Sequence, residues 1–244
     1  MKLLVLFLLS VLGFAQSEPF VKSTAYPATV LVYAQDDNGT MAMLCTGTSF
    51  EKLKEGYRFV TAAHCVAEDN IKDEKVEVDR KYFFVTLDEP NGPKQFLRAE
   101  VIYAGLQFKG DDFAVLEVKT DKVFPVVSLG EDPIEFGEPV LNVASPNGLG
   151  KQVFVGQVSN PKVDRPIEVK SISWTNAMFL QMFGVNGGSS GSAVICTKQL
   201  RVCGFIVGTI DHTNIVAIPV SRFKKFYEDS KAGKYKPFQK PIGK

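Results

Sequence analysis

Residues 192–220 read SAVICTKQLRVCGFIVGTIDHTNIVAIPV, three short runs of β-branched and apolar residues with polar turns between them. Runs of this length and composition are typical of β-strands joined by tight turns. Similar runs recur along most of the chain, at residues 28–34, 58–62, 81–87, 96–104, 113–118, 139–144 and 151–158. So many strands without long helices between them predict an all-β sandwich or a pair of barrels.

A turn-rich segment at residues 119–137 divides these strands into two β units of similar size, at about 27–118 and 137–220. One helix is predicted after them, where Ser221 can cap SRFKKFYEDSKAG and Gly233 can end it. We therefore expect one domain over residues 18–226, followed at 227–244 by the helix end and a basic tail.

The first 17 residues, MKLLVLFLLSVLGFAQS, have the layout of a secretory signal peptide. Lys2 precedes an uncharged apolar run, and the small residues Ala15 and Ser17 offer two cleavage points. The run is shorter than the roughly 20 residues that span a bilayer, so a lasting membrane anchor is not expected. We predict a secreted or periplasmic protein.

Composition and cysteine content narrow the function further. The chain is 45% hydrophobic and 23% charged, and its net charge of +1 gives no field that would attract nucleic acid. Four cysteines in an exported chain indicate disulfides, and their spacings do not resemble those of zinc sites. With two distant histidines and no carboxylate cluster, neither a metal nor another cofactor is expected.

Three segments together carry the chemistry. His64 lies in TAAHC, Asp112 opens DFAVLEV, and Ser190 lies in NGGSSGSA. Each is common by itself: a lone histidine, an acidic turn, a glycine-rich loop. Together they supply a hydroxyl, a base to remove its proton and a carboxylate to orient that base. The glycines allow backbone N–H groups to approach a developing oxyanion.

These segments resemble the histidine, aspartate and serine motifs of the chymotrypsin-like serine peptidases. Within that group the chain is most similar to the HtrA-type peptidases, through residues 128–159, CGFIVG (203–208) and AIPVSRF (217–223). The resemblance covers roughly residues 28–226, and because the sequence ends about 20 residues after AIPVSRF, no PDZ domain is expected to follow. It implies two six-stranded antiparallel β-barrels with the site between them, and protein or peptide substrates. It does not fix the oligomeric state.

The resemblance also implies the roles of individual residues. Ser190 would be the nucleophile, His64 the general base and Asp112 the residue that orients His64, with Asp111 only a neighbour. The backbone N–H groups of Gly188 and Ser190 would form the oxyanion hole.

Specificity follows from the same resemblance. Gly184 would lie at the base of the specificity pocket, with Val207, Gly208 and Thr209 along its wall. That lining is uncharged, so we expect cleavage after small or medium apolar residues, unless Asp211 or His212 approaches the pocket.

Two disulfides are predicted on different grounds. Relatives bridge the positions of Cys45 and Cys65. Cys196 and Cys203 flank TKQLRV, which is typical of a hairpin, so they can face each other across it.

Ser189 replaces the Asp or Asn that the resembled family carries, and Ser192-Ala193 replaces Gly-Pro. These changes remove no catalytic atom. Digestive relatives switch on when a new N-terminal amine pairs with an Asp just before the nucleophile, and Ser189 has no charge to offer it. We therefore expect activity without processing beyond signal removal.

Two other functions remain open. The first is a binding protein that kept this fold and lost catalysis. The second is an α/β-hydrolase esterase, because residues 187–191 also fit Gly-x-Ser-x-Gly with Ser189 as nucleophile. Asp211 and His212 follow in the required order, but as neighbours and without α/β alternation around them.

Overall fold

The computed structural model describes residues 17–70, 75–78, 82–87, 95–131, 134–163, 165–169, 172–235 and 238–239. The predicted signal peptide lies outside these residues except for Ser17, as does the end of the predicted basic tail beyond Gln239. Within them, none of the helices has the length and apolar character needed to cross a bilayer.

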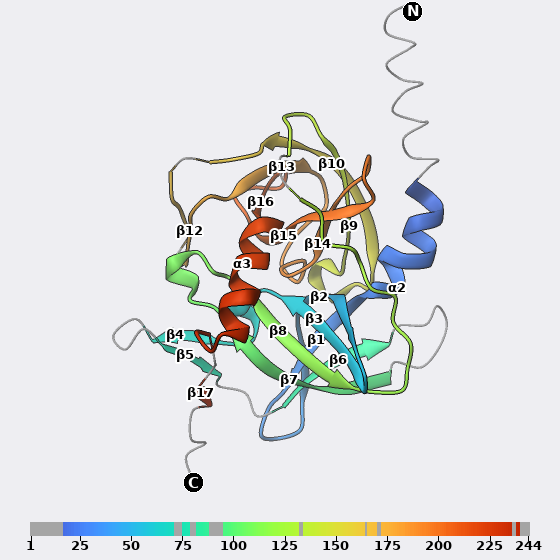
Figure 1. Cartoon of the computed structure of the whole chain (residues 1–244), viewed down its shortest axis with the longest axis vertical. Coiled ribbons are helices and arrows are strands. Elements are labelled where there is room, and N and C mark those ends of the chain that lie inside the picture. Colours follow the sequence, from blue (N-terminus) through green and yellow to red (C-terminus); the bar gives the residue numbers. More distant parts are fainter. Residues whose placement is uncertain are drawn as a thin grey trace, which may run out of the picture.

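The first barrel is closed by six antiparallel strands in the order β1-β2-β3-β8-β7-β6, and it forms the lower half of the molecule in Figure 1. Its strands are β1 (Thr29–Gln35), β2 (Met41–Leu53), β3 (Gly56–Thr61), β6 (Tyr82–Leu87), β7 (Gln95–Ala104) and β8 (Ala114–Lys119). Side chains such as Val32, Phe59 and Leu116 fill its interior. Because successive strand residues point to opposite faces, the alternate apolar residues of each run supply this core.

The second barrel has the strand order β10-β13-β16-β15-β14-β9 and also closes on itself. Its strands are β9 (Pro139–Ala144), β10 (Gln152–Asn160), β13 (Met178–Met182), β14 (Ala193–Cys196), β15 (Arg201–Thr209) and β16 (Asn214–Pro219). Residues 192–220 supply β14, β15 and β16 as consecutive antiparallel neighbours. The prediction of two six-stranded antiparallel barrels is confirmed.

Shorter elements surround the barrels. Two small sheets add β4 (Glu68–Asn70) with β5 (Lys75–Val78) and β17 (Phe238–Gln239), and β11 (Ile167–Val169) with β12 (Ile172–Trp174). Short helical turns are η1 (Val21–Ala25), α2 (Tyr26–Ala28), η2 (Ala63–Cys65), η3 (Gln107–Lys109) and η4 (Pro146–Gly148).

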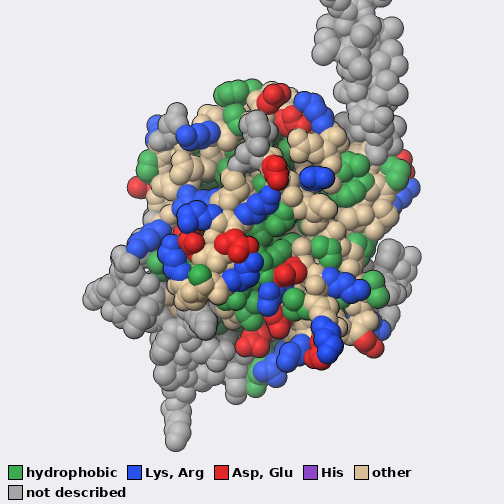
Figure 2. Space-filling view, in the orientation of Figure 1, with side chains coloured by type: hydrophobic (Ala, Val, Ile, Leu, Met, Phe, Trp, Pro, Cys, Tyr) green, Lys and Arg blue, Asp and Glu red, His purple; other side chains and the backbone are tan. Residues whose placement is uncertain are grey.

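The C-terminal helix α3 (Val220–Lys231) lies across both barrels (Figure 1). Phe223 is fully buried, and its ring centroid lies 5.1 Å from that of Phe50 in β2 and 5.0 Å from that of Phe205 in β15. Fully burying a phenylalanine contributes about 2 kcal/mol. Around α3 the surface carries basic and acidic side chains mixed together (Figure 2).

The predicted N-cap of this helix is wrong. Pro219 ends β16 in an extended conformation and itself occupies the N-cap position, so Ser221 already lies in the first turn and caps nothing. The prediction that Gly233 ends the helix is confirmed. Gly233 follows the last turn with a φ of 97°, which glycine adopts without strain.

Candidate active site

His64 and Asp112 lie together at one end of the first barrel. His64 is in η2, directly after β3, and Asp112 precedes β8, the strand that pairs with β3. Nδ1 of His64 is 2.7 Å from Oδ2 of Asp112, and the backbone N–H of His64 donates to Oδ1 at 3.0 Å. The Asp112 side chain is fully buried, whereas 23% of the His64 side chain is exposed.

Asp111 points elsewhere. Its Oδ1 accepts a hydrogen bond from Nε of Arg222 at 3.0 Å, and its Oδ2 accepts one from the hydroxyl of Tyr235 at 2.7 Å. The two neighbouring carboxylates therefore have separate partners, and Asp112 is the one that contacts the histidine.

Burial and charge oppose each other in the His64–Asp112 pair. Burial lowers the pKa of His64, but the charge of Asp112 and its hydrogen bond outweigh that and raise the pKa above its ordinary value. Burial likewise raises the pKa of Asp112, while His64 and Trp174 lower it to a net value below the ordinary one. The pair therefore favours an ionised carboxylate.

The loop that carries Ser190 comes from the second barrel and rests on the first. The backbone N–H of Thr46, in β2, donates to the carbonyl of Ser190 at 3.0 Å, and the Thr46 hydroxyl donates to the carbonyl of Gly188 at 2.8 Å. A Cβ built on Gly191 would lie 2.6 Å from the nitrogen of Ala62, two residues before His64. The structure thus brings Ser190 and His64 to the junction of the two barrels.

The hydroxyl of Ser190 donates to the carbonyl of Val207 at a long 3.5 Å. In the part of the chain that the structure describes, no hydrogen bond joins this hydroxyl to His64. A serine hydroxyl turns about a single side-chain torsion, and such bonds are often loose before substrate binds.

The backbone N–H groups of Gly188 and Ser190 have no acceptor among the described residues, although their neighbours do. Ser189 N–H donates to Asn186, and Gly191 N–H donates to Ile206. Two free N–H groups on either side of a buried residue are what an oxyanion hole requires.

Glycine is required on both sides of Ser190 for physical reasons. Gly188 has a φ of 92°, and a Cβ there would lie 2.8 Å from the carbonyl oxygen of Ser145. Gly191 has a φ of 85°, and a Cβ there would lie 2.5 Å from the carbonyl oxygen of Thr46. Both positions combine left-handed backbone with a close backbone approach.

The predicted specificity residues lie on two segments of the second barrel. Gly184 follows β13, and a Cβ built on it would lie 2.9 Å from the ring of Phe154 in β10. Val207, Gly208 and Thr209 end β15, and Val207 is 2% exposed. Phe154 is an apolar contact of Gly184 that the sequence did not point to.

Asp211 and His212 are the polar residues that the sequence analysis allowed to approach the specificity pocket, and both lie in the turn between β15 and β16. Asp211 caps the turn between β15 and β16: its Oδ1 accepts hydrogen bonds from the backbone N–H groups of Thr213 and Asn214, both at 2.8 Å. These hydrogen bonds, led by that from the Asn214 side chain, lower the pKa of Asp211. His212 is exposed in the same turn.

Ser189 is fully buried. A buried hydroxyl cannot attack a substrate, and the all-β fold excludes the α/β-hydrolase alternative.

Both expected disulfides are present. Cys45 in β2 is bonded to Cys65, the last residue of η2, with 6.1 Å between their Cα atoms. Cys196 and Cys203 are bonded across the turn between β14 and β15. Cys45, His64 and Cys65 form a cluster of the size that holds a metal, but the bonded cysteines have no thiolate to offer.

Besides Phe154, two residues at this site were not predicted from the sequence. Trp174 in β12 donates its indole Nε1–H to Oδ2 of Asp112 at 3.0 Å, and Thr46 holds the serine loop as described above. Neither lies within a recognisable motif. Trp174 is 62 residues from its partner, and a lone tryptophan is usually a core residue.

Comparisons with known proteins place the chain in a peptidase family. Residues 45–205 match the family described as "Trypsin-like peptidase domain". The active form of the Rv3671c protease from M. tuberculosis superimposes with a TM-score of 0.65 at 16% identity, covering 92% of this chain and 88% of that one. The serine endoprotease from Yersinia pestis gives 0.63 at 22% identity, with coverage of 91% and 68%.

A third solved structure, Deg5, gives a TM-score of 0.63 at 19% identity, with coverage of 86% and 91%. At these identities the three structures establish a shared fold. No curated protein matches the sequence closely enough to count as a relative.

Proposed function

The chain belongs to the trypsin-like peptidase family and is a serine endopeptidase, and we propose that it cleaves peptide bonds with Ser190 as nucleophile, His64 as general base and Asp112 as the residue that orients His64. One observation carries this assignment. Nδ1 of His64 is held at 2.7 Å by the fully buried carboxylate of Asp112. That contact fixes Nδ1 as the protonated nitrogen and leaves Nε2 free to accept a proton.

The reaction then proceeds in two halves. Oγ of Ser190 attacks the carbonyl carbon of the scissile bond while Nε2 of His64 takes the hydroxyl proton. His64 returns that proton to the leaving amine, and an acyl ester on Ser190 remains. A water, deprotonated by the same nitrogen, hydrolyses the ester and restores the serine. Asp112 stays ionised throughout and stabilises the imidazolium that forms in each half.

The free N–H groups of Gly188 and Ser190 would bind the oxyanion of each tetrahedral intermediate. Before the attack, the Ser190 hydroxyl must leave the carbonyl of Val207 and turn toward His64. The 3.5 Å bond to Val207 is long, so this rotation gives up little.

A reactive-serine probe tests the assignment directly. A fluorophosphonate should label the mature protein once, and peptide mapping should place the label on Ser190. The missing Ser190–His64 hydrogen bond is the observation that favours the alternative, a binding protein without catalysis. An unlabelled, correctly folded protein would support that alternative, and a label on another serine would refute the role of Ser190.

We further propose cleavage after small or medium apolar residues. Val207, Gly208 and Gly184 carry no charge, and the ring of Phe154 lies against Gly184. Asp211 is engaged within its own turn. Profiling with a peptide library should show apolar residues before the cleaved bond. A profile dominated by Lys, Arg or Glu would mean that the pocket is built from other residues.

We also propose that the protein acts outside the cytoplasm. Two disulfides persist in an oxidising compartment, and the apolar start of the chain fits export. N-terminal sequencing of the exported protein should find a start directly after Ala15 or Ser17. Retention of the full chain in the cell would refute export.

A further inference from the structure

We propose that Trp174 is a positioning residue for the reaction, one that holds the carboxylate of Asp112 and through it the imidazole of His64. This inference rests on the proposed roles of His64, Asp112 and Ser190. Trp174 ends β12 and is 3% exposed, and its indole N–H points at a carboxylate that is fully buried. It is also the only tryptophan in the chain.

Among the residues that the structure describes, three hydrogen bonds define the orientation of the Asp112 carboxylate. Oδ1 accepts from the backbone N–H of His64 at 3.0 Å, while Oδ2 accepts from both Nδ1 of His64 at 2.7 Å and Nε1 of Trp174 at 3.0 Å. Both donors other than Trp174 belong to His64 itself. Trp174 is therefore the donor that fixes the carboxylate from outside the pair, and without it the carboxylate and the imidazole can tilt together.

The indole touches a second part of the site. A Cβ built on Gly208 would lie 2.7 Å from Cη2 of Trp174, so the six-membered ring lies directly against this glycine. Gly208 follows Val207, whose carbonyl accepts the hydroxyl of Ser190. One rigid side chain thus contacts the carboxylate at one end and the strand beside the nucleophile at the other.

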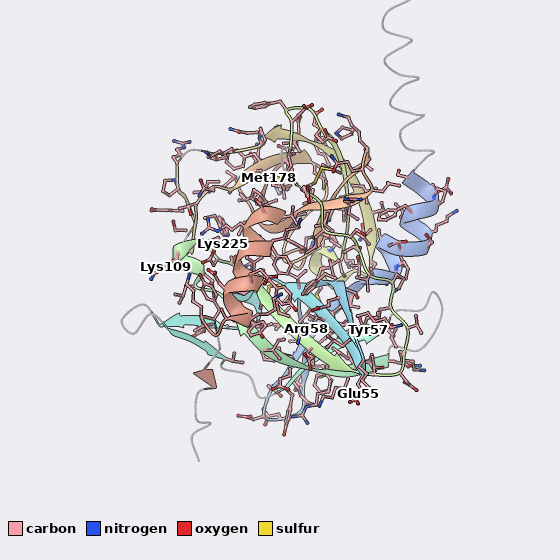
Figure 3. The ribbon with its side chains drawn as sticks, in the orientation of Figure 1. Glu55, Tyr57, Arg58, Lys109, Met178 and Lys225 are labelled. Atoms are coloured by element: carbon pink, nitrogen blue, oxygen red, sulfur yellow. A yellow bond between two sulfur atoms is a disulfide. The ribbon has the colours of Figure 1, made fainter. Side chains whose placement is uncertain are left out.

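Arg222 on α3 ties together the two segments that carry this hydrogen bond. Its Nη1 donates to the carbonyl of Thr175 at 2.7 Å, directly after Trp174, and its Nε donates to Asp111 at 3.0 Å, directly before Asp112. Nη2 also donates to the carbonyl of Lys109 at 2.7 Å, and η3 lies beside α3 in Figure 3, where Lys109 is labelled. Arg222 therefore fixes the backbone next to Trp174, and with it the position of the indole, from α3.

Trp174→Phe should lower kcat by about 10- to 100-fold, the cost of removing one hydrogen bond to a buried charge. KM should change less than about threefold, because a ring remains against Gly208. Phe124→Leu is a matched control: Phe124 is a buried aromatic residue of the first barrel that packs on Tyr57 and Phe59. This control should lose stability to a similar degree and keep its kcat.

If Trp174→Phe does not fold, the single tryptophan offers a gentler replacement. Biosynthetic incorporation of benzothienylalanine keeps the bicyclic shape and replaces the N–H with a sulfur atom that cannot donate, and it alters this site alone. The same fall in kcat supports the proposal. A kcat within about twofold of the native value in this protein, while Ser190→Ala is inactive, overturns the role of Trp174 and leaves the proposed function intact.

The indole also provides a spectroscopic check that its hydrogen bond to the Asp112 carboxylate is coupled to His64. In the ¹⁵N-tryptophan-labelled protein, one indole N–H resonance is expected, and it should shift with pH at the midpoint where kcat/KM falls. The reason is that Nδ1–H of His64 shares Oδ2 with the indole, and it becomes a stronger, charged donor when Nε2 takes up a proton. A resonance that stays constant through that pH range overturns the proposal. A native protein that fails to turn over any peptide would instead refute the proposed function.

Discussion

The environment of His64 gives the clearest expectation for a single residue. In the proposed mechanism the reactive form is the neutral imidazole, and the Asp112 carboxylate raises the pKa of His64 despite the opposing effect of burial. Raising the pKa extends the protonated, inactive form to higher pH. Activity should therefore fall as pH drops through a midpoint above roughly 6.5, the ordinary histidine value.

A kcat/KM profile measured between about pH 5 and 9 checks this expectation. A rate that stays flat down to about pH 5 would show that no histidine acts as the base. Because the Asp112 carboxylate is what raises this pKa, Asp112→Asn should move the midpoint to lower pH as well as reduce the rate.

Replacing each of the two adjacent serines in turn separates their roles. Ser190→Ala should lower turnover about a million-fold, because the nucleophile and base act as a unit, and His64→Ala should cost nearly as much. Ser189→Ala is the matched control. Its hydroxyl is fully buried and, among the described residues, accepts one weak 3.4 Å bond from the N–H of Asn186, so its loss should cost little. Substantial turnover by Ser190→Ala would overturn the assignment.

Sequence motifs point to the three residues that we propose to react, but not to the residue that we propose to position them. His64, Asp112 and Ser190 each lie within a motif, because their chemistry constrains their immediate neighbours. The bond from Trp174 to Asp112 depends only on two segments meeting in space. A short strand such as β12 leaves no periodic pattern that would show where its tryptophan points.

Among the elements, the loop before β14 should be sensitive to a single added methyl group. Gly188→Ala would place its Cβ 2.8 Å from the carbonyl oxygen of Ser145 and force a residue with a side chain to a φ of 92°. We expect the free N–H of residue 188 to move and kcat to fall about 100- to 1,000-fold, the usual effect of losing one oxyanion donor.

Gly187→Ala is the control for replacing a glycine of this loop with alanine. Gly187 has no positive φ, and a Cβ there would meet nothing within 4 Å. This variant should keep a kcat close to the native value. Equal losses in the two variants would mean that the loop, rather than the N–H of residue 188, accounts for the effect.

The two disulfides close loops of different length and should differ in their effects. Cys45 and Cys65 are 20 residues apart, and Cys196 and Cys203 are 7 apart. Loop-closure entropy then gives about 3 kcal/mol for the first and about 2 kcal/mol for the second. Denaturant unfolding of the Cys45→Ser/Cys65→Ser and Cys196→Ser/Cys203→Ser proteins measures both.

Only the first pair should also affect catalysis, because Cys65 directly follows His64. A larger loss of stability in the second double variant would contradict the ranking by loop length.

At the level of elements, the sequence predicted strands with a continuous apolar run well. It did not predict strands of mixed composition, short helical turns or the exact start of the helix. β14, β15 and β16 were found because each is an apolar run bounded by turn residues. β2 was not, since MAMLCTGTSFEKL mixes small, polar and apolar residues over 13 positions. The helical turns at residues 17–28 were missed because no apolar periodicity marks them. The start of α3 was misplaced because Pro219 serves both the strand and the helix.

In the whole molecule, α3 and its contacts join the two barrels. Arg58, in β3, donates to Glu117, Glu51 and the hydroxyl of Tyr227 on α3, and it lies at the foot of the helix in Figure 3. The rings of Phe223 and Phe113 connect the same helix to the segment that carries Asp112. His64 comes from one barrel and Ser190 from the other, so the helix helps to set their relative position. The duplicated barrel follows from the pattern of strands in the sequence, whereas these contacts appear only once the chain has folded.

The arrangement of the whole molecule also predicts how activity begins. A switch that uses a new N-terminal amine needs a buried carboxylate beside the nucleophile, because a buried charge requires a partner. Ser189 occupies that place without a charge, and Thr46 and Asn147 already brace the loop, the latter through a 2.7 Å bond from its N–H to the carbonyl of Gly187. We expect a protein made from residues 18–244 with a blocking tag on its N-terminus to match the untagged form in kcat/KM. Both forms should be assayed beside each other after their folding has been verified. A tagged protein that is folded yet silent, and that gains activity when the tag is cut off, would show that a free N-terminus completes the site after all.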